Sequence, residues 1–77
     1  SDNEFIFSGR FEIDYLNEKH KLTLPSSDEY TTLAGLLLHI RQNIPKQNEI
    51  IMMSPYYFKI LTTSETTIDQ IQLKILQ

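Results

Sequence analysis

The sequence has no cysteine, and it contains only two glycines and three prolines among its 77 residues. The absence of cysteine excludes disulfide bonds, thiolate metal sites and a cysteine nucleophile. Because only two glycines are present, no glycine-rich loop can form to cradle a phosphate group. No apolar run approaches the roughly 20 residues that a membrane-spanning helix needs. The first five residues, SDNEF, are polar and acidic, so we expect no signal peptide.

Basic residues are few and stand singly along the chain. Seven Lys and Arg residues are outnumbered by ten Asp and Glu residues, which gives a formal net charge of −3. Nucleic-acid-binding domains usually carry a basic patch, so we predict no nucleic-acid partner. The acidic residues are scattered as well, which argues against an acidic tail.

The length and the apolar content indicate one small folded domain that covers residues 1–77. Hydrophobic residues make up 40% of the chain, which is typical of a globular rather than a disordered sequence. A chain of this size buries only about 60% of the surface that its unfolded form exposes, so we expect a modest core.

The first third of the chain predicts a strand and a short helix. Glu4 to Phe11 (EFIFSGRF) is aromatic and rich in strand-forming residues, with a bulge or bend expected at Gly9. Glu12 to His20 (EIDYLNEKH) has apolar residues three apart, acids early and basic residues late, as in a short helix. The segment KLTLP is then expected to run extended into Pro25.

The stretch EYTTLAGLLLHIRQNIPKQNEI, from Glu29 to Ile50, has the strongest helical pattern. At about 100° per residue, apolar residues form one stripe along this helix. Its members are Leu33, Leu36, Leu37, Ile40 and Ile44. Pro45 is expected to end the helix, because the residue before a proline is disfavoured in the helical conformation. Ser26 and Glu29 have the S-x-x-E spacing of a capping box, and the alternative caps are Ser27, Asp28 and Thr31.

Gly35 interrupts this helical pattern, and a glycine inside a helix costs roughly 1 kcal/mol relative to alanine. It lies off the apolar stripe, and Leu38 is off the stripe as well, so the helix is apolar on more than one side. We therefore expect a second element to approach closely at Gly35, either the short helix or the Leu22–Leu24 segment. The alternative is an exposed glycine that has no partner.

Beyond the helix, apolar residues recur at every second position, which predicts three strands. They are Ile51 and Met53, then Tyr56, Phe58 and Ile60, then Ile71, Leu73 and Ile75. Turns are expected at 54–55 and 64–66. Ile68 breaks the parity with Ile71, so we expect a β-bulge near Asp69 or Gln70. The fold class is therefore α+β: a strand, a short helix, a long helix and an antiparallel three-stranded meander, with the helices packed on one face of the sheet.

No group of side chains has the spacing of a catalytic or metal site. His20 and His39 lack partners at ligand spacing, so we interpret both as surface or rim histidines. The acids at 28–29 and the pair at 14 and 18 could bind calcium weakly, but no oxygen-rich loop surrounds them. The sequence predicts no enzyme, no metal site and no cofactor.

Two other segments contain side chains suited to ligand binding. Ser8-Gly9-Arg10 offers an arginine to an anion, and a bend in an edge strand is the interpretation that we favour. Tyr56-Tyr57-Phe58 offers rings for base stacking. Strand alternation instead places Tyr56 and Phe58 on one face, in the core, and Tyr57 on the other.

Several short motifs, taken in order, resemble a known family. They are Gly9-Arg10, Asp14-x-x-Asn17-Glu18, Leu24-Pro25, Glu29-Tyr30-x-Thr32-Leu33-Ala34-Gly35-Leu36-Leu37, Ile44-Pro45, Phe58-x-Ile60 and Ile68-x-x-Ile71. The chain resembles the CorC/HlyC-type transporter-associated domain from about Phe7 to Leu76. The most specific part is the T-L-A-G-L-L run followed by I-P.

This resemblance implies an accessory, regulatory role in a bacterial membrane protein of the magnesium/cobalt efflux or haemolysin type. Residues 1–77 would then be a domain excised from a larger membrane protein, at the cytoplasmic face of the inner membrane. The implied partners are the CBS and transmembrane regions of the parent chain, and a homodimer is a further option. The alternative is a small ligand-binding domain for an adenine nucleotide, a flavin or a divalent cation, and FAD enters only through fold-level analogy.

The positions that match the family motif are structural, and the resemblance carries over no catalytic residue. They are Gly9, Asn17, Pro25, Thr32, Leu33, Gly35, Leu37, Pro45, Phe58 and Ile60. The chain departs from the family at Asn48, where glycine is common, and at Thr66-Thr67, where a basic residue is common. Asparagine tolerates the left-handed conformation, so we expect the turn to persist. The missing cation puts anion binding at Thr66-Thr67 in doubt.

The chain also contains apolar residues that one stripe and one sheet cannot all bury, such as Leu38 and Leu76. If they gather into one patch, they form a contact surface beyond the core. Such a surface would serve self-association or docking on a neighbouring domain of the parent.

Overall fold

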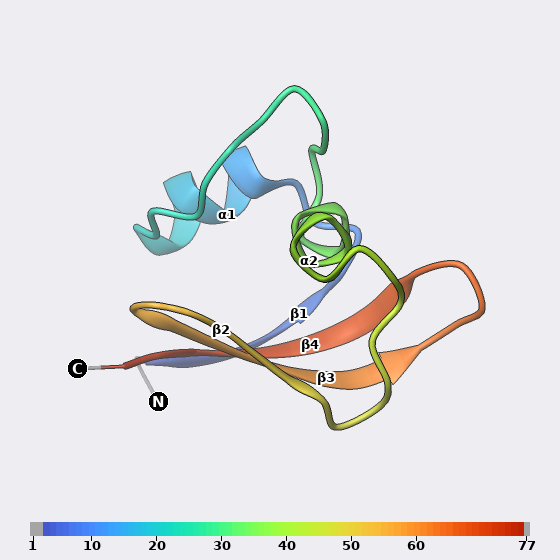
Figure 1. Cartoon of the computed structure of the whole chain (residues 1–77). Coiled ribbons are helices and arrows are strands. Elements are labelled where there is room, and N and C mark those ends of the chain that lie inside the picture. The colour runs from blue at the N-terminus through green and yellow to red at the C-terminus, as the bar shows by residue number, and fades with distance from the viewer. Residues whose placement is uncertain (1–2, 77) are drawn as a thin grey trace.

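Four antiparallel strands form one sheet, and two helices cover one of its faces (Figure 1). The computed structural model describes residues 3–76. In chain order the elements are β1 (Glu4–Ser8), α1 (Ile13–His20), α2 (Leu33–Arg41), β2 (Ile50–Met53), β3 (Tyr56–Thr63) and β4 (Ile68–Ile75). This architecture confirms the predicted α+β fold. Within residues 3–76, no helix is long and apolar enough to cross a membrane.

The first and last strands of the chain lie side by side. The strand order is β1-β4-β3-β2, so β1 extends the predicted meander at its β4 edge. Glu4 pairs with Lys74 at one end of the β1–β4 ladder, and Ser8 pairs with Gln70 at the other. Both ends of the described chain therefore lie at the same end of the sheet.

Alternate strand residues point into the core beneath the helices. In β3, Tyr56, Phe58 and Ile60 are buried, whereas Tyr57 and Lys59 are only half-buried. This confirms that Tyr56 and Phe58 belong to the core. The helices close the core with Ile13, Leu16, Leu33, Ala34, Leu36 and Leu37. Each large apolar side chain buried in this way contributes about 1.5–3 kcal/mol.

The β3–β4 ladder shifts its register twice. Its pairs around the shifts are Ile60 with Ile71, Thr62 with Gln70, and Thr63 with Ile68. Leu61 is therefore an extra residue on β3, and Asp69 is an extra residue on β4. The shift at Asp69 confirms the predicted bulge, and it allows both Ile68 and Ile71 to face the core.

The N-terminus of α2 is capped by Thr32 and not by the expected Ser26/Glu29 box or its alternatives. The Thr32 hydroxyl accepts a hydrogen bond from the N–H of Gly35 at 3.1 Å. The proposed box is absent because α2 begins only at Leu33, beyond both of its residues. The hydroxyl of Ser27 instead accepts from the N–H of Glu29 at 3.0 Å in a turn that precedes the helix.

The C-terminus of α2 also differs from the prediction, because the helix ends at Arg41, before Pro45 is reached. Gln42 adopts the left-handed conformation with a φ of 69°, and its N–H donates to the carbonyl oxygen of Leu38 at 2.7 Å. Pro45 is instead buried in the loop that follows. Ile40, expected in the buried stripe, is 40% exposed.

The turn at Asn48 persists without glycine, as expected. Asn48 has a φ of 70°, which asparagine tolerates in the left-handed region. Its N–H donates to the carbonyl oxygen of Ile60 at 2.7 Å, and the N–H of Ile60 donates to Glu49 at 2.9 Å. The loop before β2 is thereby attached to the side of β3.

Gly9 is the point where β1, β4 and α2 meet. Its N–H donates to the carbonyl oxygen of Asp69, and its own carbonyl oxygen accepts from the N–H of Ala34, both at 2.9 Å. A Cβ atom on Gly9 would overlap the carbonyl oxygen of Ile68 and lie 2.9 Å from the Cβ of Ala34. A side chain is therefore excluded at Gly9 by space, which is a stronger role than the expected bend.

Gly35 is closely approached as predicted, but by a different neighbour. A Cβ atom there would lie 3.0 Å from the Cβ of Tyr30 and 3.2 Å from the hydroxyl of Thr32. The neighbour is thus the loop that enters α2, and neither the short helix nor the Leu22–Leu24 segment. Gly35 also lies in the first turn of α2, because the helix begins at Leu33.

We predict that Gly9→Ala destabilises the domain by about 3 kcal/mol, because the added methyl group must displace the backbone of β4. Urea denaturation measures the change. Gly35→Ala is the matched control: the better helix propensity of alanine, worth about 1 kcal/mol, offsets its closer contact with Tyr30. Equal stability of the two variants would contradict the role assigned to Gly9.

We also predict that Gly35→Leu lowers the free energy of unfolding by about 1–2 kcal/mol, although leucine is a better helix former than glycine. The longer side chain has to push away Tyr30, which packs against the core. Urea denaturation of the variant and the parent domain measures the difference in the free energy of unfolding. A variant as stable as the parent domain would show that Tyr30 yields without cost.

Candidate interaction surface

Asn17 fixes the extended segment that follows α1. Its side-chain amide donates to the carbonyl oxygen of Leu24 and accepts from the N–H of Leu24, both at 2.9 Å. The amide thus pairs with this residue as a neighbouring strand would. Tyr56 holds the same segment from the sheet: its hydroxyl accepts from the N–H of Thr23 at 2.7 Å. These two contacts keep Leu22 and Leu24 buried.

The ten motif residues are spread through the domain and do not meet in one cavity. Leu33, Leu37, Phe58 and Ile60 are core residues. Pro25 is exposed, and its carbonyl oxygen accepts from the hydroxyl of Tyr30 at 3.0 Å. None of the ten motif residues lines the acidic hollow described below or the depression beside it. The structure places them where they build the fold.

The N-terminal N–H groups of α2 are all used inside the protein. The N–H of Leu33 donates to the carbonyl oxygen of Phe11 at 2.9 Å, and that of Ala34 donates to Gly9. The N–H of Gly35 is taken by Thr32. A helix N-terminus binds phosphate through such groups when they are free. At α2 a phosphate would have to displace these internal bonds.

An acidic hollow of about 120 Å³ lies between the start of α1 and the loop before α2. Its lining residues are Glu12, Ile13, Asp14, Ser26, Ser27, Tyr30 and Thr31. Asp28 lies beside it, in a shallower depression that also includes Asp14. Among the described residues, no three His, Cys, Asp or Glu side chains come together to hold a metal ion.

Both histidines lie against aromatic rings at the rim of the helical layer. The ring of His20 is 4.9 Å from that of Phe5 and 5.1 Å from that of Phe7, centroid to centroid. His39 is exposed, with its ring 5.3 Å from that of Tyr30. These positions confirm the interpretation of both as surface or rim histidines.

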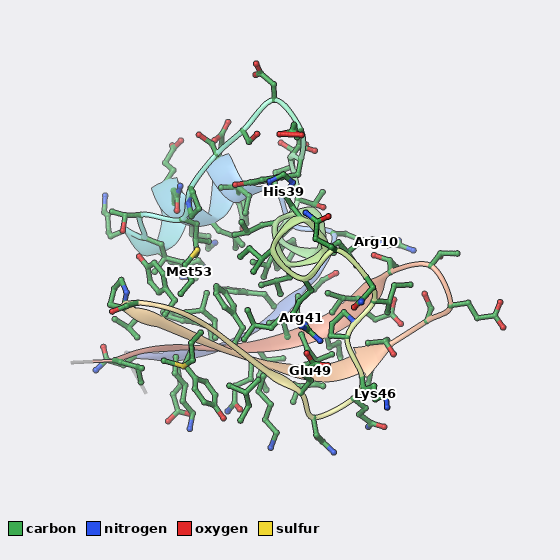
Figure 2. All side chains as sticks on the ribbon, in the orientation of Figure 1. Arg10, His39, Arg41, Lys46, Glu49 and Met53 are labelled. Atoms are coloured by element: carbon green, nitrogen blue, oxygen red, sulfur yellow. The ribbon has the colours of Figure 1, made fainter. Side chains whose placement is uncertain are left out.

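An exposed ion pair joins the C-terminus of α2 to the start of β2, where Arg41 and Glu49 point toward each other (Figure 2). Glu49 also accepts a hydrogen bond from the N–H of Lys46 at 3.1 Å. A surface pair of this kind contributes about 0–1 kcal/mol. Its carboxylate and guanidinium are engaged with each other, so this loop offers no free charge pair to a ligand.

The sheet face opposite the helices is uncovered, and we call it the open sheet face. One row across it consists of Ile6, Gln72, Lys59 and Ile50, and the next consists of Glu4, Lys74, Tyr57 and Met52. Apolar side chains lie on the two edge strands: Ile6 is 65% exposed, Met52 56% and Ile50 49%. Figure 2 shows side chains that end in nitrogen projecting from this face.

The apolar surface differs from the one expected. Leu38 is half-buried and packs against the core, so its place in an exposed patch was wrong. Leu76 is 43% exposed. Phe11 and Tyr15 form a separate exposed pair near α1, with ring centroids 5.7 Å apart. The exposed apolar residues therefore fall into more than one group.

The sequence alone does not reveal the open sheet face, because its rows combine strands that are far apart in the chain. A signal existed: the runs Phe5–Phe7 and Ile50–Met53 are continuously apolar, so each strand carries apolar side chains on both of its faces. Alternation alone cannot tell which residues become neighbours, since that depends on the pairing of β1 with β4.

The geometry is that of a small α+β domain whose polar groups serve mainly its own fold. Residues 1–77 match the family CorC_HlyC, which is described as a transporter associated domain. The chain belongs to this transporter-associated domain family, as its motifs indicated.

Two curated relatives are much longer proteins that contain a segment similar to this chain. UPF0053 protein YegH of Escherichia coli K12 is 29% identical over 73 residues, which are 95% of this chain and 14% of that protein. The polyamine export protein of Haemophilus influenzae is 26% identical over 77 residues, or 99% of this chain and 18% of that protein. The chain thus spans less than a fifth of the length of these relatives.

Solved structures share the fold over nearly the whole chain. A conserved protein of unknown function from Haemophilus influenzae superposes with a TM-score of 0.89 at 26% identity, covering 99% of this chain and 93% of that one. The transporter associated domain of a Xylella fastidiosa hemolysin, solved in complex with Mg²⁺ and Mn²⁺, has a TM-score of 0.80 at 24% identity, covering 96% and 89%. At that identity the second structure shows the fold alone.

We predict that this domain has no tight site for Mg²⁺, Mn²⁺, Co²⁺ or Zn²⁺, because its carboxylates are not clustered as ligands. Isothermal titration calorimetry tests this with each ion in turn. Stoichiometric binding at micromolar concentration would contradict it. The pair Asp14→Asn and Asp28→Asn, with Glu65→Gln as a control outside the acidic hollow, would then locate the site.

Proposed function

We propose that this domain is an accessory, regulatory module of a larger bacterial membrane protein that exports cations. It acts through contacts with other parts of its parent and carries out no reaction of its own. The observation that carries the proposal is the match of residues 1–77 to the transporter-associated family. The short share of each relative that the chain covers also supports it, because the rest of such a protein has to supply the transport path.

The transported species in this proposal is a cation. The family resemblance implies magnesium or cobalt efflux, and one curated relative is named a polyamine export protein. Polyamines are cations at neutral pH, so both point to the same class of cargo. The proposed location is the cytoplasmic face of the inner membrane, next to the CBS and transmembrane regions of the parent.

The structure supports contact rather than ligand chemistry as the mode of action. The N-terminal N–H groups of α2 are bonded internally, so that helix end offers no prepared site for the phosphate of a nucleotide or flavin. The acidic hollow lacks clustered ligands. The proposal therefore requires no cofactor, and small-ligand binding remains the weaker alternative.

We predict that deleting this domain from its parent leaves the membrane region inserted and able to export cations, but changes how export responds to conditions. Export from cells is measured at low and high cation load, with and without the domain. A parent carrying Glu65→Gln, a change in the exposed β3–β4 turn, is the control for substitution alone. Export that is unchanged at every load would rule out the regulatory role.

A further inference from the structure

We draw no further inference here: the strongest candidate, the exposed edge of β2 where Ile50 and Met52 flank the open sheet face, carries none, because nothing in the structure of residues 3–76 shows what covers it.

Discussion

The backbone contact at Gly9 is the constraint on which the arrangement of the two layers depends. At this residue, β1 leaves the sheet with its N–H bonded to Asp69 of β4 and its carbonyl oxygen bonded to the first turn of α2. Both bonds require the backbones to approach within a distance that a Cβ atom would occupy. The bulge at Asp69 is part of the same contact, because it changes the parity of β4 where β1 ends.

The position of α2 then determines how the rest of the helical layer is built. Because Leu33 and Ala34 donate to Phe11 and Gly9, the helix start is attached to the sheet through the chain that leads into α1. The N–H of Ile13 donates to the carbonyl oxygen of Thr31 at 2.8 Å, so both helices begin at the same place. Both helices are therefore committed to one face of the sheet, and the other face stays open (Figure 1).

Sequence patterns predicted the elements that depend on the local periodicity of apolar residues. They failed at the ends of α2, where hydrogen bonds to other parts of the chain determine the structure. The strands, the short helix and the bulge followed from the spacing of apolar residues such as Ile68 and Ile71. The start of α2 could not be predicted in this way, because several residues before it have side chains able to cap a helix and the sequence does not show which of them is used. Thr32 became the cap because Phe11 and Gly9 take the next two N–H groups. Likewise Gln42, with an ordinary side chain, ended the helix before Pro45 was reached.

The candidate surface was harder to predict than the fold, and for a physical reason. A catalytic or metal site leaves a trace in the sequence, since its chemistry requires particular residue types. A docking surface requires only that ordinary residues become neighbours, and here Ile6 and Ile50 belong to one row because two other strands lie between them. The motif residues build the interior and hold the helices on one side. The exposed residues of the open sheet face are not needed for the packing of the core, so substitutions there can alter contacts without altering the fold.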